Sequence, residues 1–367
     1  MKKMIYYYPN PLSQNPNSGS SIRPLKMLNA FIELGYDVEL ISGYSSTRKK
    51  DIERVKRNIR AGVKYSFMYG ENTSMPTALS DENHLPLHPI LDLTFFKFLS
   101  QNNIPVGLFY RDIYWKFEVY RKQVKLHKRI PAKFFYHTEL FVLNRYLTKF
   151  YLPSLKMLDY VPYIKQSIAS ALPPANDFLK NMPIRQISPP LKLLYVGGIS
   201  DSYKMHELLK GVSKTENIEL TICTREEDWH NTCHEYSKYL SDNISIVHKS
   251  GDQLQQLYLE HDISMMYFLA DEYRKFAMPV KLFEYISREK PIIASEGMLV
   301  STIVEDLDVG WVVEYDADKL HNFLTDLVQN NAEIYSKINN CKLIKPSNTW
   351  LARAKQVEGD LLNRENK

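Results

Sequence analysis

The chain has 367 residues, 44% of them hydrophobic and 24% charged, which predicts two domains of a globular protein with full apolar cores. These values exclude a disordered chain, a collagen and a coiled coil. No run of 18 or more apolar residues is present, and the N-terminus lacks the apolar segment of a signal peptide, so we expect neither a membrane-spanning helix nor secretion. Three cysteines in a chain of this length favour a reducing, cytoplasmic location.

The net charge of +5 is divided unevenly along the chain. Residues 1–175 contain 25 Lys and Arg against 13 Asp and Glu, a net charge of +12, whereas residues 176–367 contain 22 against 29, a net charge of −7. A basic half suits an anionic surface such as phospholipid or nucleic acid. Excess charge can also serve solubility alone, so both interpretations stay open.

In the first half, short apolar runs predict strands that are separated by helical or irregular segments. These strands are Met4–Tyr8, Val38–Ile41, Val63–Met68, Ile104–Phe109 and Phe150–Leu152. A loop rich in Pro, Asn and Ser follows the first strand up to Ser20, and an amphipathic helix then extends to Leu34, where Gly35 ends it. Two proline pairs, Pro173-Pro174 and Pro189-Pro190, flank a polar segment that we expect to be a linker.

In the second half, strands alternate with helices, which predicts βαβ units and a parallel sheet. The strands are Leu193–Val196, Ile218–Cys223, Ile244–Val247, Ile263–Phe268, Pro291–Ala294 and Gly310–Val313, and the helices are His206–Val212, Glu226–Leu240, Gln253–Glu260 and Val280–Ser287. After Pro346, the apolar residues Trp350, Ala354, Val357 and Leu361 follow a helical spacing and predict one amphipathic helix.

Two short segments of the second half carry candidate binding residues. Gly197 and Gly198 end a predicted strand and precede Lys204, an arrangement that lets backbone amides and a cation approach an anion, although a simple tight turn explains it as well. Pro279 is well placed to start a helix on which Lys281 and Glu284 share one face. Such a pair can hold a phosphate and a ribose diol, or it can be a plain surface ion pair, which the spacing alone favours.

These segments resemble the glycosyltransferases of GT-B fold, and within them the large retaining group called family 4. Their N-terminal glycine loop and following strand are similar to residues 19–24 and 35–40. Their donor-domain entry is similar to residues 195–198 with Lys204, and their P-x-K-L-x-E-Y…G-K-P-V-I-A signature is similar to residues 279–295. The last match is the most specific, and the hinge at Leu172-Pro173-Pro174 resembles their P-P-G turn.

The resemblance implies an α/β fold of GT-B type, with two Rossmann-like domains that face each other across a cleft. We expect an acceptor-binding domain at 1–175, a linker at 176–190, a nucleotide-sugar-binding domain at 191–345 and a C-terminal helix at 346–367 that crosses back to the first domain. The resemblance also assigns roles. Glu284 would accept hydrogen bonds from the ribose, Lys204 and Lys281 would neutralise the diphosphate, and the remaining donor-binding candidates are Gly19, Gly197, Gly198, Arg225, Lys249, Ser250 and Pro279.

Two departures from the family pattern concern the donor site. Many members have an arginine where Gly198 stands, so one diphosphate cation is missing, and Arg225 or Lys281 is the expected substitute. Members with an E-x7-E motif have a glutamate where this chain has Phe276, which puts in doubt a carboxylate that touches the sugar.

The first half has two further candidates. Arg111 and Asp112 follow a predicted strand and are candidates to orient an acceptor hydroxyl, or they form a structural ion pair. The segment from Trp115 to Tyr136 mixes cations with aromatic residues, which favours anionic lipid, RNA or merely a solvated helix with a buried aromatic face.

We therefore predict a metal-independent glycosyltransferase that moves a sugar from a nucleoside diphosphate sugar to a hydroxyl of a glycan. The expected acceptor is lipid-linked and belongs to the synthesis of a bacterial surface polysaccharide such as a capsule. No cofactor, metal or nucleic acid is expected, and an anionic membrane surface is a candidate partner at the inner face of the cell membrane. The alternatives are a GT-B nucleotide-sugar epimerase and a non-catalytic partner subunit.

Overall fold

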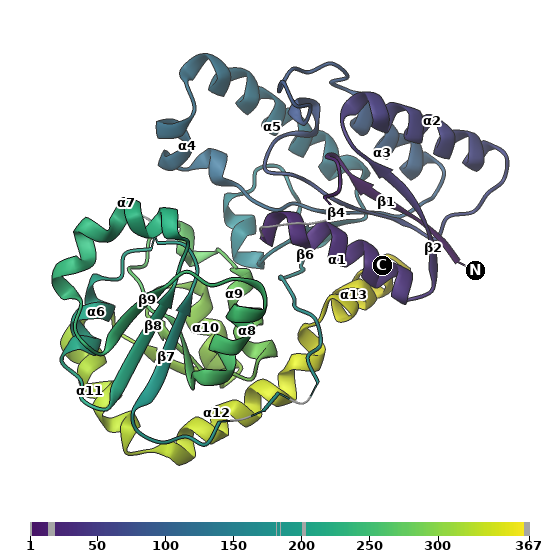
Figure 1. The fold of residues 1–367 in the computed structure, drawn as a ribbon. Helices are drawn as coiled ribbons and strands as arrows, with labels where there is room; N and C mark the ends of the chain where they lie inside the picture. Colours follow the sequence, from purple (N-terminus) through teal and green to yellow (C-terminus); the bar gives the residue numbers. More distant parts are fainter. Residues whose placement is uncertain (1, 14–18, 181, 184, 200–202, 363–367) are drawn as a thin grey trace. The chain divides into compact units, whose positions relative to one another are not determined.

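The computed structural model describes residues 2–13, 19–180, 182–183, 185–199 and 203–362. The chain divides into two compact units (Figure 1). Unit 1 comprises Met1–Pro174 together with Trp350–Lys367, and unit 2 comprises Ala175–Thr349. Each unit is built around one parallel sheet that is covered by helices, which confirms the predicted α/β class with two Rossmann-like halves.

The sheet of unit 1 has the strand order β2-β1-β3-β4-β5-β6 among the described residues, and all its pairs are parallel. Its strands are β1 (Lys2–Tyr8), β2 (Tyr36–Ser42), β3 (Met68–Glu71), β4 (Val106–Phe109), β5 (Lys149–Leu152) and β6 (Ala169–Ala171). The chain runs from β1 outward to β2 and then returns to the other side of β1, so the switch point of this sheet lies between β1 and β3.

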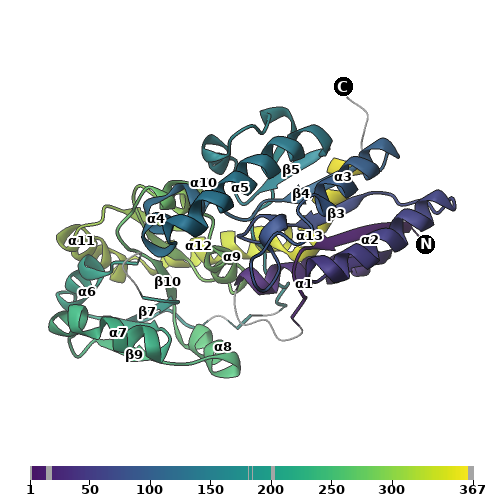
Figure 2. The same cartoon turned by 90° about the horizontal axis from the view of Figure 1, so that it is seen from above.

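The helices of unit 1 include one from the end of the chain. They are α1 (Gly19–Glu33), α2 (Ser45–Arg60), α3 (Leu91–Gln101), α4 (Glu118–Gln123), α5 (Leu126–Tyr146) and α13 (Trp350–Leu362), with short 3-10 helices at Thr77–Leu79, Tyr114–Lys116, Leu155–Tyr160 and Gln166–Ile168. The last helix, α13, packs beside α1 in both views (Figures 1 and 2). Its predicted apolar face is buried, because Trp350, Ala354, Val357 and Leu361 are at most 6% exposed.

The sheet of unit 2 has the order β12-β11-β10-β7-β8-β9 among the described residues, again with parallel pairs only. The strands are β7 (Leu191–Val196), β8 (Ile218–Cys223), β9 (Ile244–Val247), β10 (Ile263–Met266), β11 (Ile292–Ser295) and β12 (Gly310–Val313). The helices are α6 (His206–Ser213), α7 (Glu226–Tyr236), α8 (Gly251–Glu260), α9 (Val280–Ser287), α10 (Leu299–Asp306), α11 (Ala317–Val328) and α12 (Asn331–Ile344), with 3-10 turns at Ser237–Tyr239, Tyr273–Lys275 and Lys345–Asn348. Its switch point lies between β7 and β10.

Both sheets are buried on their two faces, as their apolar runs predict. In β1 the residues from Met4 to Tyr7 have no exposed surface, and in β10 the four residues are at most 1% exposed. Fully covered parallel strands show no alternation of polar and apolar residues, and this is why the short runs of the sequence identify them.

One strand prediction is wrong, and two others are too long; of these two, the predicted strand Ile263–Phe268 already ends at Met266. The segment Val63–Met68 is not a strand except for its last residue, because the ladder with β1 begins at the pair Ile5↔Met68. Tyr65 and Phe67 are nevertheless buried, and the Phe67 carbonyl accepts from the Ile5 amide at 3.1 Å, so the chain already lies beside β1 before the strand begins. The predicted strand Ile104–Phe109 begins only at Val106. Pro105 has no N–H and cannot donate to a ladder. Within the described residues, no helix is long and apolar enough to span a membrane.

Candidate functional site

The switch point of unit 2 brings together two loops that the sequence separates by about seventy residues. One loop follows β7 and contains Gly197 and Tyr203, and the other follows β10 and leads into α9. Ligands of open parallel sheets bind outside the carboxyl ends of the strands at such a point. The Lys204 carbonyl accepts hydrogen bonds from the Leu269 amide at 3.1 Å and from the Tyr315 hydroxyl at 2.7 Å, which joins the two loops.

Lys281 lies directly against the backbone of Gly197. A Cβ atom at Gly197 would stand 1.7 Å from the Lys281 Nζ, and the residue has a φ of +147°, so only glycine allows this approach. The ammonium donates to the Tyr195 hydroxyl at 3.1 Å, and that hydroxyl donates to the Gly198 carbonyl at 2.8 Å. Gly197 and Lys281, which belong to two separate motifs, are therefore in direct contact.

A second cation, Arg274, lies beside Lys281. Its guanidinium stands 3.9 Å from the centroid of the Tyr203 ring, and the Lys281 Nζ stands 4.8 Å from the same centroid. Arg274 is only 7% exposed. Sequence reasoning did not identify this residue, although Arg274-Lys275 is a basic pair shortly before the Pro279 motif. Arg274 adds a second cation beside Lys281, where sequence reasoning expected Lys281 or Arg225 to compensate for the residue at Gly198.

Burial and the neighbouring Arg274 lower the pKa of Lys281. The pKa falls from 10.5 to about 7, and Glu284 opposes the shift. Two partly buried like charges that share one aromatic ring repel each other. An anion bound between them would relieve this repulsion and restore the charge of the lysine. The geometry therefore suits a phosphate or diphosphate group.

Glu284, on α9, pairs with Arg288 and not with Lys281. Its Oε1 lies 3.7 Å from the Arg288 guanidinium, which also donates to the Glu284 carbonyl at 3.2 Å and stacks over Tyr258 at 4.3 Å. The Glu284 side chain is 28% exposed, so the carboxylate is held in place and still reachable. The interpretation of Lys281 and Glu284 as a plain surface ion pair is therefore not supported by the structure. Pro279 is the residue at the start of α9, with extended backbone, as expected.

The other donor-binding candidates lie at the carboxyl ends of the neighbouring strands. Arg225 precedes α7 and Ser250 precedes α8, and both are exposed, as are Lys204 and Lys249. The loops after β8 and β9 touch, because the Thr224 amide donates to the Val247 carbonyl at 3.0 Å. A Cβ at Gly198 would lie 3.1 Å from Asp228 Oδ2, so an acidic residue of α7 borders this loop. Phe276 is buried and packs on Tyr273.

Unit 1 has a pocket of about 280 Å³ at its own switch point. It is lined by residues of four segments: Tyr8, Asn10, Ser21, Thr73, Ser74, Met75, Ser80, His84 and Arg111. Arg111 therefore lies in a cavity, whereas the Asp112 Oδ1 accepts from the amides of Ile113 at 2.6 Å and Tyr114 at 3.0 Å. These bonds give Asp112 a role in holding the turn after β4. Gly19 is the first residue of α1.

The aromatic residues that bound the basic segment are not on the surface. Trp115 and Tyr136 are 2% and 3% exposed, and their rings stack at 4.7 Å with 11° between the planes. For these two rings the structure agrees with the alternative of a buried aromatic face, and Tyr136 lies on the buried side of α5. The same helix exposes a different apolar stripe, four residues that are each between 59% and 66% exposed: Leu126, Ile130, Phe134 and Phe141.

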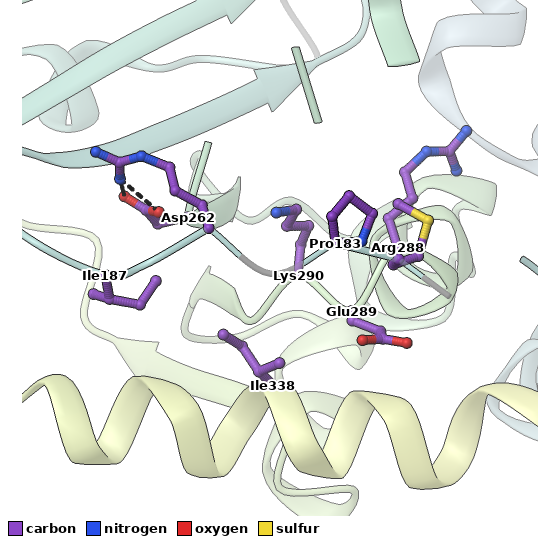
Figure 3. A pocket seen from close by; sticks show the side chains of 9 residues that line it. Pro183, Ile187, Asp262, Arg288, Glu289, Lys290 and Ile338 are labelled. Carbon is purple, nitrogen blue, oxygen red and sulfur yellow. Dashed lines mark hydrogen bonds and ion pairs between the residues drawn. The ribbon is translucent and has the colours of Figure 1, made fainter. Parts of the chain in front are cut away.

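A small cavity of unit 2 lies near the amino ends of β10 and β11, away from the switch point. It has a volume of about 10 Å³, room for one water, and is lined by Arg185, Asp262 and Lys290 among others (Figure 3). Arg185 donates to both Asp262 oxygens, at 2.8 and 2.6 Å. Asp262 stands just before β10, so this ion pair fastens the segment before β7 to the amino ends of the strands. Among the described residues, no group of three or more His, Cys, Asp or Glu side chains is arranged for a metal ion.

Residues 190–330 match the family model described as glycosyl transferases group 1. This range contains the switch point of unit 2 with Gly197, Lys281 and Glu284. No curated protein matches the sequence significantly.

Solved structures of glycosyltransferases share the fold over nearly the whole chain. HepE from Anabaena, solved with UDP and glucose, superimposes with a TM-score of 0.62 at 11% identity and covers 97% of this chain and 98% of its own. Sucrose-phosphate synthase from Thermosynechococcus elongatus has a TM-score of 0.63 at 13% identity, with 97% of both chains covered. WaaG, a glycosyltransferase involved in lipopolysaccharide biosynthesis, has a TM-score of 0.59 at 11% identity, with 98% and 100% covered. The chain therefore has the GT-B fold.

Proposed function

We propose that the protein is a glycosyltransferase that takes its sugar from a nucleoside diphosphate sugar. The observation that carries this proposal is the pair of cations at the switch point of unit 2. Lys281 and Arg274 share the Tyr203 ring, and Lys281 is pressed against Gly197, so the arrangement concentrates positive charge at the carboxyl end of the sheet, where a diphosphate could bind. The match of residues 190–330 to glycosyl transferases group 1 and the UDP bound by HepE support a diphosphate in this position.

In the proposed reaction, Lys281 and Arg274 stabilise the charge that grows on the diphosphate as the bond to the sugar breaks. The exposed Lys204 approaches the same group from the loop after β7. Glu284, oriented by Arg288, accepts hydrogen bonds from the ribose hydroxyls. Arg225, Lys249 and Ser250 surround the base. We propose that the configuration at the anomeric carbon is retained and that no metal takes part, with the leaving phosphate accepting the proton of the acceptor hydroxyl.

We propose that the acceptor binds to unit 1 and is a lipid-linked glycan of a bacterial surface polysaccharide. WaaG, which has the same fold, is involved in lipopolysaccharide biosynthesis. The pocket at the switch point of unit 1 has hydroxyl, amide and cationic groups on its walls, and these are the groups that bind sugars in water. The role of Gly19 at the donor diphosphate stays a prediction.

Docking on the inner face of an anionic membrane is part of this proposal. The exposed stripe of α5 provides apolar side chains for the interface, and Lys125, Lys128 and Lys133 lie on the same helix or next to it. Each such cation contributes about 1 kcal/mol near an anionic surface. We expect the protein to float with anionic liposomes and not with neutral ones, and to dissociate in high salt.

The test compares variants at exposed apolar residues of α5 with a control variant in unit 2. Replacing Phe134 and Phe141 by Ser should abolish flotation. Replacing Leu343, an exposed residue of unit 2 (76%), should leave flotation unchanged. Equal binding to neutral and anionic vesicles, or none to either, would contradict the membrane proposal and leave α5 as an ordinary solvated helix.

The test of the proposed function is a panel of nucleotide sugars whose effect on thermal unfolding is measured. At least one should stabilise wild-type protein, since binding to the folded state alone raises its stability. Glu284→Ala should remove this stabilisation, and Glu219→Ala, an exposed carboxylate of unit 2, should not. Product analysis separates the alternative: an epimerase converts the nucleotide sugar without an acceptor, and a non-catalytic subunit converts nothing.

A further inference from the structure

The pocket of unit 1 has an excess of positive charge that its own structure does not neutralise. Of the described residues that line it, none is acidic, and Arg111 is its permanent cation. The carboxylate that pairs with Arg111 is Glu71, which ends β3 and has no exposed surface. Whether the pocket attracts an anion therefore depends on how far Glu71 neutralises the charge of Arg111.

One carboxylate oxygen of Glu71 already has two hydrogen-bond donors. Arg23 Nε donates to its Oε1 at 3.0 Å, and the Tyr69 hydroxyl donates to the same oxygen at 2.9 Å. Arg111 reaches only 4.0 Å from Oε2, and its NH2 is buried without a hydrogen bond to any described residue. The Oε2 atom of Glu71, which faces Arg111, also has no hydrogen bond to any described residue. Two guanidinium groups thus share one carboxylate, so these three side chains together keep one net positive charge, and Arg111 is the member that lines the pocket. An arginine in this state binds carboxylate and phosphate oxygens strongly.

A second feature adds to this charge. Ser21 lines the pocket from the first turn of α1, a helix of 15 residues. The amino end of a helix carries a partial positive charge, which favours an anion. Tyr8 and Ser74 also line this space with hydroxyl groups, whereas the Ser80 hydroxyl already donates to the Thr77 carbonyl at 2.8 Å.

The wall opposite β1 is held rigid by α5. The buried Glu139 accepts from the Asn72 side chain at 2.7 Å and from the Thr77 amide at 2.6 Å. The Tyr136 hydroxyl donates to the Ser74 carbonyl at 2.5 Å. The segment from residue 72 to 77 is therefore fixed before any ligand arrives, which lowers the cost of ordering it on binding. The volume of about 280 Å³ suits one sugar residue rather than an oligosaccharide.

We propose that this pocket binds an anionic group on the acceptor, a carboxylate or a phosphate, with Arg111 as its counter-ion. The inference rests on the proposed function in one respect only, that the bound molecule is the acceptor. The acceptor sugar would then be a uronic acid or a sugar phosphate, and a neutral sugar of the same size would bind much less tightly.

The experiment measures binding to the full-length protein by calorimetry in the presence of saturating UDP. The probes are glucuronate, glucose 6-phosphate, inorganic phosphate and neutral glucose. We expect at least one of the three anions to bind about tenfold or more tightly than glucose, and its affinity to fall with added salt. The first two probes distinguish a carboxylate from a phosphate. Failure of all three anions to bind, or equal binding of glucose, would overturn the proposal.

Variants locate the binding. Arg111→Gln should weaken the binding of the anion about tenfold or more, because the charged partner is lost. Arg111→Lys, which keeps the charge and loses the planar fork, should retain part of it. Arg57→Gln, at an exposed arginine of the same unit, should change nothing. Unchanged binding in Arg111→Gln would contradict the assignment, and the comparison of probes on wild-type protein decides the question even where a variant is unstable.

UDP separates this inference from the proposed function. If the anion site were the donor diphosphate site, UDP would displace the probes, and that result would overturn the inference while leaving the donor proposal intact. Conversely, a nucleotide-sugar panel without any effect would contradict the proposed function and leave anion binding to this pocket measurable.

Discussion

The lowered pKa of Lys281 predicts that donor binding depends on pH near neutrality. The free protein has a pKa of about 7 at this lysine, because burial and Arg274 disfavour its charged form. A bound diphosphate favours the charged form and raises the pKa again. Binding therefore takes up a proton, and the affinity falls as the pH rises through about 7 until it reaches the pKa of the complex.

The expected magnitude follows from linkage. Above the free pKa, each pH unit weakens binding about tenfold, which is about 1.4 kcal/mol. The phosphates of a nucleotide sugar are diesters and do not titrate between pH 6 and pH 9, so the lysine dominates the change. Calorimetry with the nucleotide sugar that the panel identifies should show an affinity about tenfold lower at pH 8 than at pH 6. Measurements in buffers with different ionisation heats should show proton uptake.

Two variants make this prediction refutable. Lys281→Arg keeps a permanent charge and should bind with little pH dependence. Lys281→Met should lose donor binding and gain stability, since it removes a charge that folding buries. The difference between pKa values of 10.5 and about 7 corresponds to about 4 to 5 kcal/mol. Because the side chain is only partly buried, we expect Lys281→Met to raise the free energy of unfolding by about 2 kcal/mol near neutral pH. Equal wild-type affinity at pH 6 and pH 8, or the same pH slope in Lys281→Arg, would refute the reasoning.

The sign of the stability effect can be checked separately. The folded pKa lies below the unfolded one, so the unfolded state binds more protons between about 7 and 10.5. In this range the contribution of Lys281 to the free energy of unfolding rises with pH, and below about 7 its full cost is present. Urea titrations of wild-type protein and Lys281→Met should therefore converge as the pH is raised towards 10.

Three further variants test other parts of the account. Glu284→Ala should lower nucleotide affinity by about 1.5–3 kcal/mol in calorimetry, because the ribose loses a charged acceptor, and an unchanged affinity would remove Glu284 from the site. Lys204→Ala should lower turnover more than donor affinity, since charge on the diphosphate grows in the transition state, and a rise in KM alone would count against this role. Leu361→Ala should lower the free energy of unfolding by about 2–5 kcal/mol, because this fully buried residue of α13 packs on β4 at Gly107. Leu362→Ala, at a position 37% exposed, should lower it far less. Equal losses in the two variants would show that α13 does not stabilise unit 1 through this face.

The sequence predicts most of the strands because both sheets are parallel and covered on two faces. Runs such as Ile218–Cys223 and Gly310–Val313 are strands with the expected bounds. The segment Val63–Met68 misleads because burial of Tyr65 and Phe67 imitates a strand, and apolar character does not reveal where a ladder begins. The helix α5 shows the same limit, since the sequence does not reveal which rings of the basic segment face inward.

For the candidate site, the sequence identifies the residues of each motif but not how the motifs meet. Gly197 and Lys281 are 84 positions apart, and only the order β10-β7 in the sheet explains why one must be glycine beside the other. Arg274 lies in the short 3-10 turn Tyr273–Lys275 between β10 and α9, which is too short for any periodicity to mark it. Its contribution depends on the shared Tyr203 ring, a tertiary contact that spacing does not encode.

Transfer of a sugar is the central claim, and its direct measurement is the formation of a new glycosidic bond. Wild-type protein would be incubated with the radiolabelled nucleotide sugar that the panel identifies and with lipid-linked oligosaccharides from the source cells. We expect label in the lipid-linked fraction, one nucleoside diphosphate released for each sugar transferred, and neither with Lys281→Met. Conversion of the nucleotide sugar to an epimer without an acceptor, or no conversion with any acceptor while the donor binds, would contradict the account.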